Sequence, residues 1–176
     1  MLYVLDASAL INNPFFSFSK RNKYACTLEV LEELRSFEVK ALAENALKMN
    51  LLRVYKPKHK YKKGAEKLAK KYGFERLSKA DLSIIALALQ LKKERKRFVV
   101  ITDDYSIQNF LAMRKINYWA PVQGTIKEVI SFEKFCPVCM KIFNKTPKKN
   151  ECPDCGVKLK SRRVKVKAQR YENMFY

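Results

Sequence analysis

The chain has 176 residues, of which 48% are hydrophobic and 31% charged, and its formal net charge is +20. This length and hydrophobic content fit one moderate domain with a small appendage and exclude wholesale disorder. No apolar run approaches the roughly 20 residues that span a bilayer, and the start lacks the basic segment of a signal peptide, so we expect a cytoplasmic protein without a membrane partner.

Strands and helices alternate along the first 131 residues. In chain order, the pattern predicts a strand over 2–5, a helix over 27–47, a strand over 51–56, a helix over 64–74, a helix over 78–94, a strand over 97–102, a helix over 104–115 and a short strand over 116–122. Such alternation indicates crossover connections. The fold class is therefore expected to be α/β, with a parallel sheet covered by helices on both faces.

Positive charge is concentrated in two segments. Residues 1–52 are neutral overall and residues 77–133 carry +3, whereas residues 53–76 carry +8 and residues 134–176 carry +9. This uneven distribution favours binding to nucleic acid over a uniformly lysine-rich surface. Tyrosine and phenylalanine interleave with lysine in the basic segment 53–76 and would suit stacking on unpaired bases. Alternatively, these aromatic side chains pack in the core.

Four of the five cysteines form two C-x2-C pairs separated by twelve residues: Cys136, Cys139, Cys152 and Cys155. Four thiolates at this spacing supply closed tetrahedral coordination, so they predict one structural zinc ion rather than a catalytic one or two disulfides. The fifth, Cys26, is expected to be a small buried apolar residue. Alternating lysines around residues 157–167 predict strands of a small ribbon with a basic face.

Carboxylates follow or open several of the predicted elements. Asp6 follows the first strand, Asp103 and Asp104 follow the strand over 97–102, and Asp81 lies in the first turn of the helix over 78–94. Each also has a capping interpretation: Asp6 and Asp104 as N-caps, and Asp81 as the partner of Ser78 in a capping box.

Glu33 and Glu32 differ in the direction that a continuous helix over 27–47 would give them. Val30, Leu34, Phe37 and Ala41 then define the apolar face, Glu33 flanks this face, and Glu32 points to solvent. If the first strand lies beside the strand over 97–102, the carboxylates converge on one edge of the sheet. Carboxylates packed together repel one another unless a hard cation, Mg²⁺ or Mn²⁺, neutralises them.

The motifs YVLDASALI, TLEVLEELR, SKADLSIIALA and VVITDDYSIQNF resemble the ordered motifs of PIN-domain nucleases. The resemblance implies Asp6, Glu33, Asp81 and Asp104 as the acidic catalytic residues, with Asp6, Asp81 and Asp104 as principal ligands of Mg²⁺ or Mn²⁺. Asp103 and Thr102 are implied as auxiliary residues, and Ser8 and Asn109 as supporting polar residues.

A PIN-like domain followed by a zinc ribbon resembles the endonuclease family that matures the 3′ end of small-subunit ribosomal RNA. The resemblance implies a metal-dependent endoribonuclease acting on precursor ribosomal RNA within the pre-ribosomal small subunit. Two alternatives are a non-catalytic RNA-binding assembly factor and a toxin-type PIN ribonuclease that attacks transfer or messenger RNA. A DNA-binding regulator would leave the acidic residues unexplained.

The domains are expected at 1–131 for the nuclease domain with its basic segment 53–76, at 132–162 for the zinc ribbon and at 163–176 for a basic tail. Basic residues around the cysteines are the candidates for RNA contact, through phosphate binding. They are Lys148, Lys149, Lys158, Lys160, Arg162, Arg163, Lys165 and Lys167.

Overall fold

The structure is a computed structural model that describes residues 1–74, 76–143, 147 and 149–167. Two compact units make up the chain, and their described parts are residues 1–127 and 128–167. Among the described residues, none of the helices combines the length and apolar character that crossing a membrane requires.

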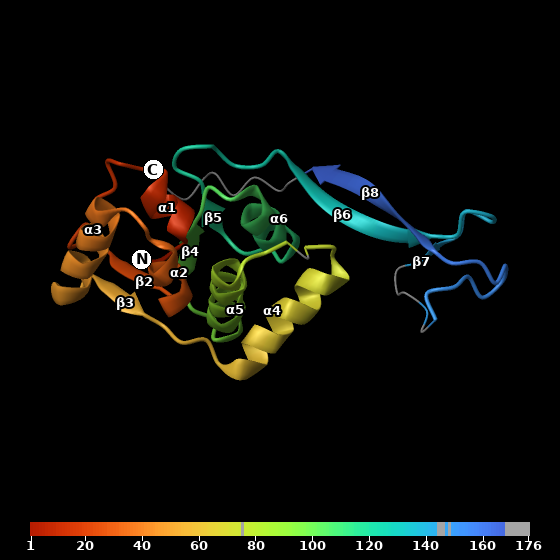
Figure 1. Cartoon of the computed structure of the whole chain (residues 1–176), viewed down its shortest axis with the longest axis horizontal. Coiled ribbons are helices and arrows are strands. Elements are labelled where there is room, and N and C mark those ends of the chain that lie inside the picture. The colour runs from red at the N-terminus through yellow and green to blue at the C-terminus, as the bar shows by residue number, and fades with distance from the viewer. Residues whose placement is uncertain (75, 144–146, 148, 168–176) are drawn as a thin grey trace. The chain divides into compact units, whose positions relative to one another are not determined.

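The first unit is built on a five-stranded parallel sheet with the strand order β3-β2-β1-β4-β5. Its strands are β1 (Leu2–Leu5), β2 (Lys23–Cys26), β3 (Leu52–Val54), β4 (Phe98–Ile101) and β5 (Tyr118–Trp119). Its helices are α1 (Ala7–Ile11), α2 (Leu28–Glu33), α3 (Phe37–Lys48), α4 (His59–Lys71), α5 (Lys79–Lys93) and α6 (Tyr105–Met113). Figure 1 shows α1 and α3 on one side of the sheet and α4 to α6 on the other. The predicted α/β class is confirmed.

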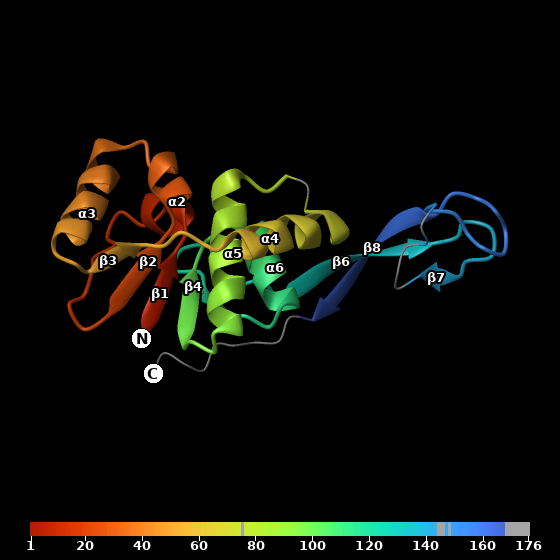
Figure 2. The ribbon, with the colours of Figure 1, turned by 90° about the horizontal axis from the view of Figure 1, so that it is seen from below.

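The core of this unit lies along β1, β4 and α5. All four residues of β4 are buried, as expected for a central strand of a parallel sheet that helices cover on both faces. Ser78 begins α5 as an N-cap, and the helix is buried on most of its circumference. Figure 2 shows α5 in front of the sheet, beside β4.

Four details differ from the sequence-based expectations. The predicted helix over 27–47 is two helices, because Ser36 leaves helical geometry and caps α3 by accepting a hydrogen bond from Val39 N at 3.3 Å. Phe37 is 81% exposed, so the predicted apolar face is wrong. Strand β2 was not predicted, since its four residues are too few to show a period of two. Helix α4 begins at His59 rather than at residue 64.

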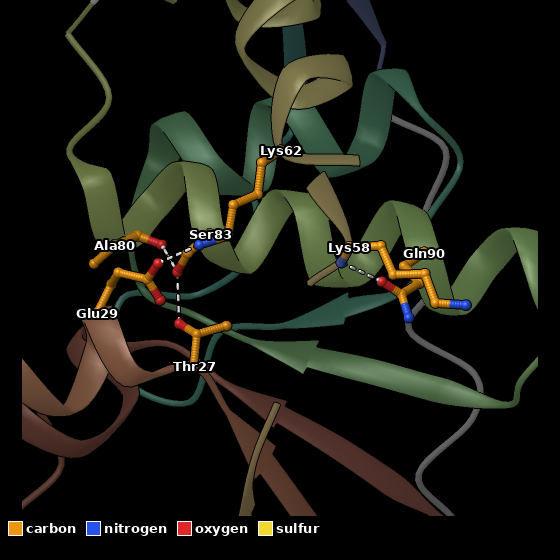
Figure 3. Close-up of polar contacts among 7 residues, drawn as sticks. All are labelled: Thr27, Glu29, Lys58, Lys62, Ala80, Ser83 and Gln90. Carbon is orange, nitrogen blue, oxygen red and sulfur yellow. Dashed lines mark hydrogen bonds and ion pairs between the residues drawn. The ribbon is translucent and has the colours of Figure 1, made fainter. Parts of the chain in front are cut away.

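Polar contacts join the start of α2 to α5 and join α4 to α2 (Figure 3). Thr27, at the end of β2, shares a 2.5 Å hydrogen bond with Ser83 of α5, and both side chains are buried. Lys62 of α4 forms a 2.6 Å ion pair with Glu29 of α2. The buried Thr27–Ser83 contact ties the first turns of α5 to the carboxyl edge of the sheet, where the predicted site lies.

The second unit is an antiparallel sheet with the order β7-β6-β8, formed by β6 (Glu128–Phe135), β7 (Ile142–Phe143) and β8 (Lys160–Lys167). Strand β6 pairs along its whole length with β8. This unit therefore starts at residue 128 rather than at 132, and residues 163–167 of the expected tail belong to β8. Residues 168–176 lie outside the described residues.

Candidate functional site

Strands β1 and β4 are neighbours, with Leu5 opposite Ile101, so the residues that follow them meet at one edge of the sheet. The backbone N–H of Asp6 donates a 3.0 Å hydrogen bond to the carbonyl of Ile101. Thr102 and Asp104 follow β4 directly. Crevices outside the carboxyl ends of parallel strands are the usual ligand sites of such sheets.

The Asp6 carboxylate is only 2% exposed and is held by neighbouring hydroxyl groups. Its Oδ2 accepts hydrogen bonds from Ser8 Oγ at 2.6 Å and from Thr102 Oγ1 at 2.9 Å. Burial raises the pKa of Asp6 to about 6, with a smaller contribution from the charge of Asp81, although the two hydroxyl groups oppose this shift. A cation nearby would restore the charged form.

Asp81 and Glu33 are joined through Ser78. In a reciprocal capping box, Asp81 Oδ2 accepts a hydrogen bond from Ser78 N at 2.7 Å and Asp81 N donates to Ser78 Oγ at 3.1 Å. The same Ser78 hydroxyl donates to Glu33 Oε1 at 3.0 Å. Glu33 ends α2, so this contact brings a second helix to the site. Burial raises the pKa of Asp81, and the charge of Asp104 raises it further.

Asp104 caps α6, since its Oδ1 accepts hydrogen bonds from Ser106 N at 2.5 Å and Ile107 N at 3.2 Å. Asp6, Asp81 and Asp104 are thus linked electrostatically. The charge of Asp81 raises the pKa of Asp6, and the charge of Asp104 raises the pKa of Asp81. We call these three residues with Glu33 the acidic cluster. The capping predictions and the convergence predicted for the site are compatible, because one carboxylate oxygen can cap while the other faces elsewhere.

The donor set of the acidic cluster fits a hydrated hard cation. Oδ1 of Asp81 and Oδ2 of Asp104 accept no hydrogen bond from any residue that the structure describes, and Oδ1 of Asp6 lies outside the hydroxyl contacts. No three carboxylates in the described ranges have ligand atoms that all lie within 4.8 Å of one another. A cation shared by the cluster would therefore be held through water by at least one carboxylate, which Mg²⁺ allows because it keeps several waters and binds directly through one or two carboxylates.

The Asp103 carboxylate is directed toward the turn after β5 rather than toward the acidic cluster. Asp103 is buried, and its Oδ1 accepts hydrogen bonds from Val122 N at 3.0 Å and Gln123 N at 2.9 Å. Asn109 Nδ2 lies 4.0 Å from the sulfur of Met113, within α6. Asp103 therefore holds the turn after β5, and Thr102 is the better placed of the two predicted auxiliary residues.

Sequence reasoning identified Ser78 as a helix cap but not as the link between Glu33 and Asp81. The motif that marks the capping box, serine three residues before Asp81, was visible in the sequence. The contact with Glu33 was not, because the break after α2 turns the helix end toward α5.

The four cysteines of the second unit converge as predicted. They form the sole group of three or more potential metal ligands in the described ranges whose ligand atoms all lie within 4.8 Å of one another, and Sγ of Cys139 and Cys152 are 3.8 Å apart. Zinc–sulfur bonds of about 2.3 Å in a tetrahedron place sulfurs about 3.8 Å apart. The cluster therefore has the dimensions of a tetrahedral metal centre.

Each cysteine pair sits in a turn of the same kind. Met140 N donates to Cys136 O at 2.9 Å, and Gly156 N donates to Cys152 O at 2.8 Å. The residue after each pair is left-handed, with φ of 59° at Met140 and 70° at Gly156. Val138 N also donates to Cys136 Sγ at 3.4 Å. Such backbone N–H groups stabilise a metal-bound thiolate.

The predicted RNA contacts are exposed where the structure describes them. Exposed side chains are those of Lys149, Lys158, Lys160, Arg162, Arg163 and Lys165, whereas Lys148 and the side chain of Lys167 lie outside the described part. Arg162 pairs with Glu133 at 3.3 Å and Lys165 with Glu128 at 2.7 Å, so part of the charge is neutralised.

Three of the four tyrosine and phenylalanine side chains in the basic segment 53–76 pack against the core of the first unit. Tyr55 contacts the main core, and Tyr61 and Phe74 contact the cluster around Ala65 and Phe110. The core-packing alternative is therefore the better description of these three side chains.

Comparison with known proteins shows that this chain is similar to ribonucleases. A family model described as the PIN domain of ribonuclease matches residues 3–91. Endoribonuclease Nob1 of Methanocaldococcus jannaschii is 35% identical over 174 residues, which cover 95% of this chain and 80% of that protein. Endoribonuclease Nob1 of Methanothermobacter thermautotrophicus is 32% identical over 93% of this chain and 94% of its own length. Ribonuclease VapC1 of Thermoplasma acidophilum is 30% identical over 91% of this chain and 77% of its own length.

Proposed function

Because this chain belongs to the family of PIN-domain ribonucleases that includes the Nob1 endoribonucleases, we propose that it is a metal-dependent endoribonuclease. Its substrate is precursor small-subunit ribosomal RNA within the pre-ribosomal small subunit, cut at the 3′ end in the cytoplasm. The observation that carries this proposal is the acidic cluster, in which the buried Asp6 and the partly buried Asp81 and Asp104 interact electrostatically near the ends of β1 and β4.

Asp6, Asp81 and Asp104 would hold Mg²⁺ or Mn²⁺, which when bound polarises a phosphodiester and lowers the pKa of water. Thr102 and Ser8 fix the orientation of Asp6 through their hydroxyl groups. Glu33, held by Ser78, orients the attacking water or binds the ion directly or through water. Hydrolysis of the phosphodiester then leaves 5′-phosphate and 3′-hydroxyl ends. The basic residues of the second unit hold the RNA.

The four cysteines would hold one structural Zn²⁺. All four ligand positions are filled by thiolates, so the ion has no open position for substrate. Metal analysis of the purified protein should give one zinc per chain, and Cys152→Ser should lose it. Retention of zinc by that variant would contradict this ligand set.

Cleavage of a 3′-extended small-subunit RNA fragment tests the proposed activity. We expect a discrete cut with Mn²⁺ or Mg²⁺, none with EDTA, and none with Asp104→Asn. Asparagine caps a helix about as well as aspartate, so this variant should fold like the parent. Equal cleavage by the variant would favour a contaminant, and the absence of any cut would favour a non-catalytic assembly factor. Preferential cleavage of transfer or messenger RNA would favour the toxin-type alternative.

A further inference from the structure

A basic cavity lies at the edge of the sheet opposite the acidic cluster. It has a volume of about 470 Å³, and its lining includes five cations: Lys92, Arg95, Lys96, Arg97 and Lys115. Phe98 and Met1, also in the lining, mark the amino ends of β4 and β1. Strands of four residues separate the two edges by about 13 Å, so this cavity is distinct from the acidic cluster. We call it the amino-edge cavity.

The described residues contribute no carboxylate to the lining of the amino-edge cavity. Glu94, the nearest in sequence, accepts a hydrogen bond from Gln90 Nε2 at 3.0 Å on its own helix. Within the described ranges, Arg95, Lys96, Arg97 and Lys115 form no ion pair. Among the residues that the structure describes, the positive charge of the cavity therefore has no paired counterion.

The carboxyl ends of two helices neutralise only part of the positive charge in the cavity. Helices α5 and α6 both end at the cavity, and each carboxyl end carries about half a negative charge. Lys92 offsets the partial charge at the end of α6, since its Nζ donates hydrogen bonds to the carbonyls of Arg114 and Lys115. Two helix ends offset about one positive charge, which leaves most of the five cations unbalanced. Burial lowers the pKa of Lys92. Repulsion by the positive charges of Arg114 and Lys115 lowers it further.

We propose that the amino-edge cavity binds phosphate groups of an RNA strand, as a second RNA contact remote from the acidic cluster. Unbalanced cations around a concave surface of this size are the chemistry that recognises phosphate. Several separate cations suit successive phosphates of a strand better than one phosphate group. The choice of RNA rests on the proposed function, whereas the phosphate chemistry rests on the cavity alone.

Two of the cavity's cations stand at backbone positions where glycine can replace them without strain. Arg95 and Lys115 have φ of 54° and 52°, and each directly follows the C-cap residue of a helix. The following residues close Schellman-type bonds, Lys96 N to Leu91 O at 3.0 Å and Ile116 N to Leu111 O at 2.9 Å. Glycine prefers this conformation, so Arg95→Gly with Lys115→Gly removes two charges and should not lower Tm. Lys20→Ala with Arg21→Ala, both exposed in a loop, removes the same charge elsewhere.

The test measures the affinity of the full-length protein for a labelled single-stranded RNA oligonucleotide in EDTA, at several salt concentrations. Each lost phosphate contact should reduce the slope of log affinity against log salt by about 0.7. We expect a reduction of about 1.4 for Arg95→Gly/Lys115→Gly and a smaller change for the loop variant; equal slopes for the two double variants would overturn the proposal. Because no cleavage occurs in EDTA, the result is independent of the acidic cluster and of whether the protein is a nuclease.

A second measurement separates RNA from small phosphate compounds. Inorganic phosphate and ATP are added to the parent protein and to Arg95→Gly/Lys115→Gly, and Tm is recorded. Stabilisation of the parent alone, together with an unchanged RNA salt slope, would assign the cavity to a free phosphate compound and reject RNA as its occupant.

Discussion

Thr102 Oγ1 donates a 2.9 Å hydrogen bond to Oδ2 of Asp6, from the residue after β4 to the residue after β1. The same hydroxyl oxygen accepts a 3.1 Å hydrogen bond from Asp104 N. One threonine side chain therefore connects two members of the acidic cluster across the sheet edge.

We expect Thr102→Val to lower the free energy of unfolding by about 2 kcal/mol, because a buried hydrogen bond to a charged group is lost without a change in side-chain size. The pKa of Asp6 should rise further, since one of the groups that lower it is removed. Urea unfolding at neutral pH measures the first effect. Ser106→Ala, at an exposed hydroxyl in the same region, is the control, and an equal loss in the two variants would contradict a special role for Thr102.

In the protein without divalent metal, the raised pKa of Asp6 predicts a free energy of unfolding that depends on pH. Between the ordinary value of 3.8 and about 6, the folded protein binds more protons at this site than the unfolded chain, so the stability contribution falls as pH rises. A shift of about two units corresponds to about 3 kcal/mol. Most of this difference falls between pH 4 and pH 7, so Asp6→Asn should gain about 2.4 kcal/mol relative to the parent over that range in EDTA. A pH-independent difference between the two would refute this assignment.

Glu33 and Glu32 provide a matched pair for activity. Glu33 accepts the Ser78 hydrogen bond at the acidic cluster, whereas Glu32 is exposed and its side chain accepts no hydrogen bond from a described residue. We expect Glu33→Gln to reduce kcat by about tenfold or more, with Glu32→Gln close to the parent. Single-turnover cleavage in Mn²⁺ measures both. Similar rates for the two variants would remove Glu33 from the site.

Met140 occupies a position that favours glycine. Its φ of 59° matches the 70° of Gly156 in the equivalent turn, and a non-glycine residue there costs about 1 kcal/mol. Because metal binding and folding are coupled in such units, Met140→Gly should raise zinc affinity about fivefold. Gly156→Ala should lower it similarly. Competition with a chelator measures both, and a loss of affinity with Met140→Gly would be inconsistent with strain at this turn.

Features with a local sequence signal were predicted well. The strand at β4, the cap at Ser78 and the cysteine pairs each depend on neighbouring residues, and the structure contains all three. Features that depend on tertiary packing were not predicted. The helix break after Glu33, the short central strand β2 and the start of the second unit at Glu128 follow from contacts between distant segments. Glu33 lies next to Ser78, the capping-box partner of Asp81, although the continuous helix used to place it does not exist.

The central claim is that Asp6, Asp81 and Asp104 share a divalent cation. The most direct measurement is anomalous diffraction from crystals of the protein soaked in Mn²⁺. We expect a peak at the carboxyl edge of the sheet, about 2.1 Å from at least one carboxylate oxygen of the acidic cluster, and its loss in Asp81→Asn. Full Mn²⁺ occupancy elsewhere with no peak among these three residues would contradict the claim.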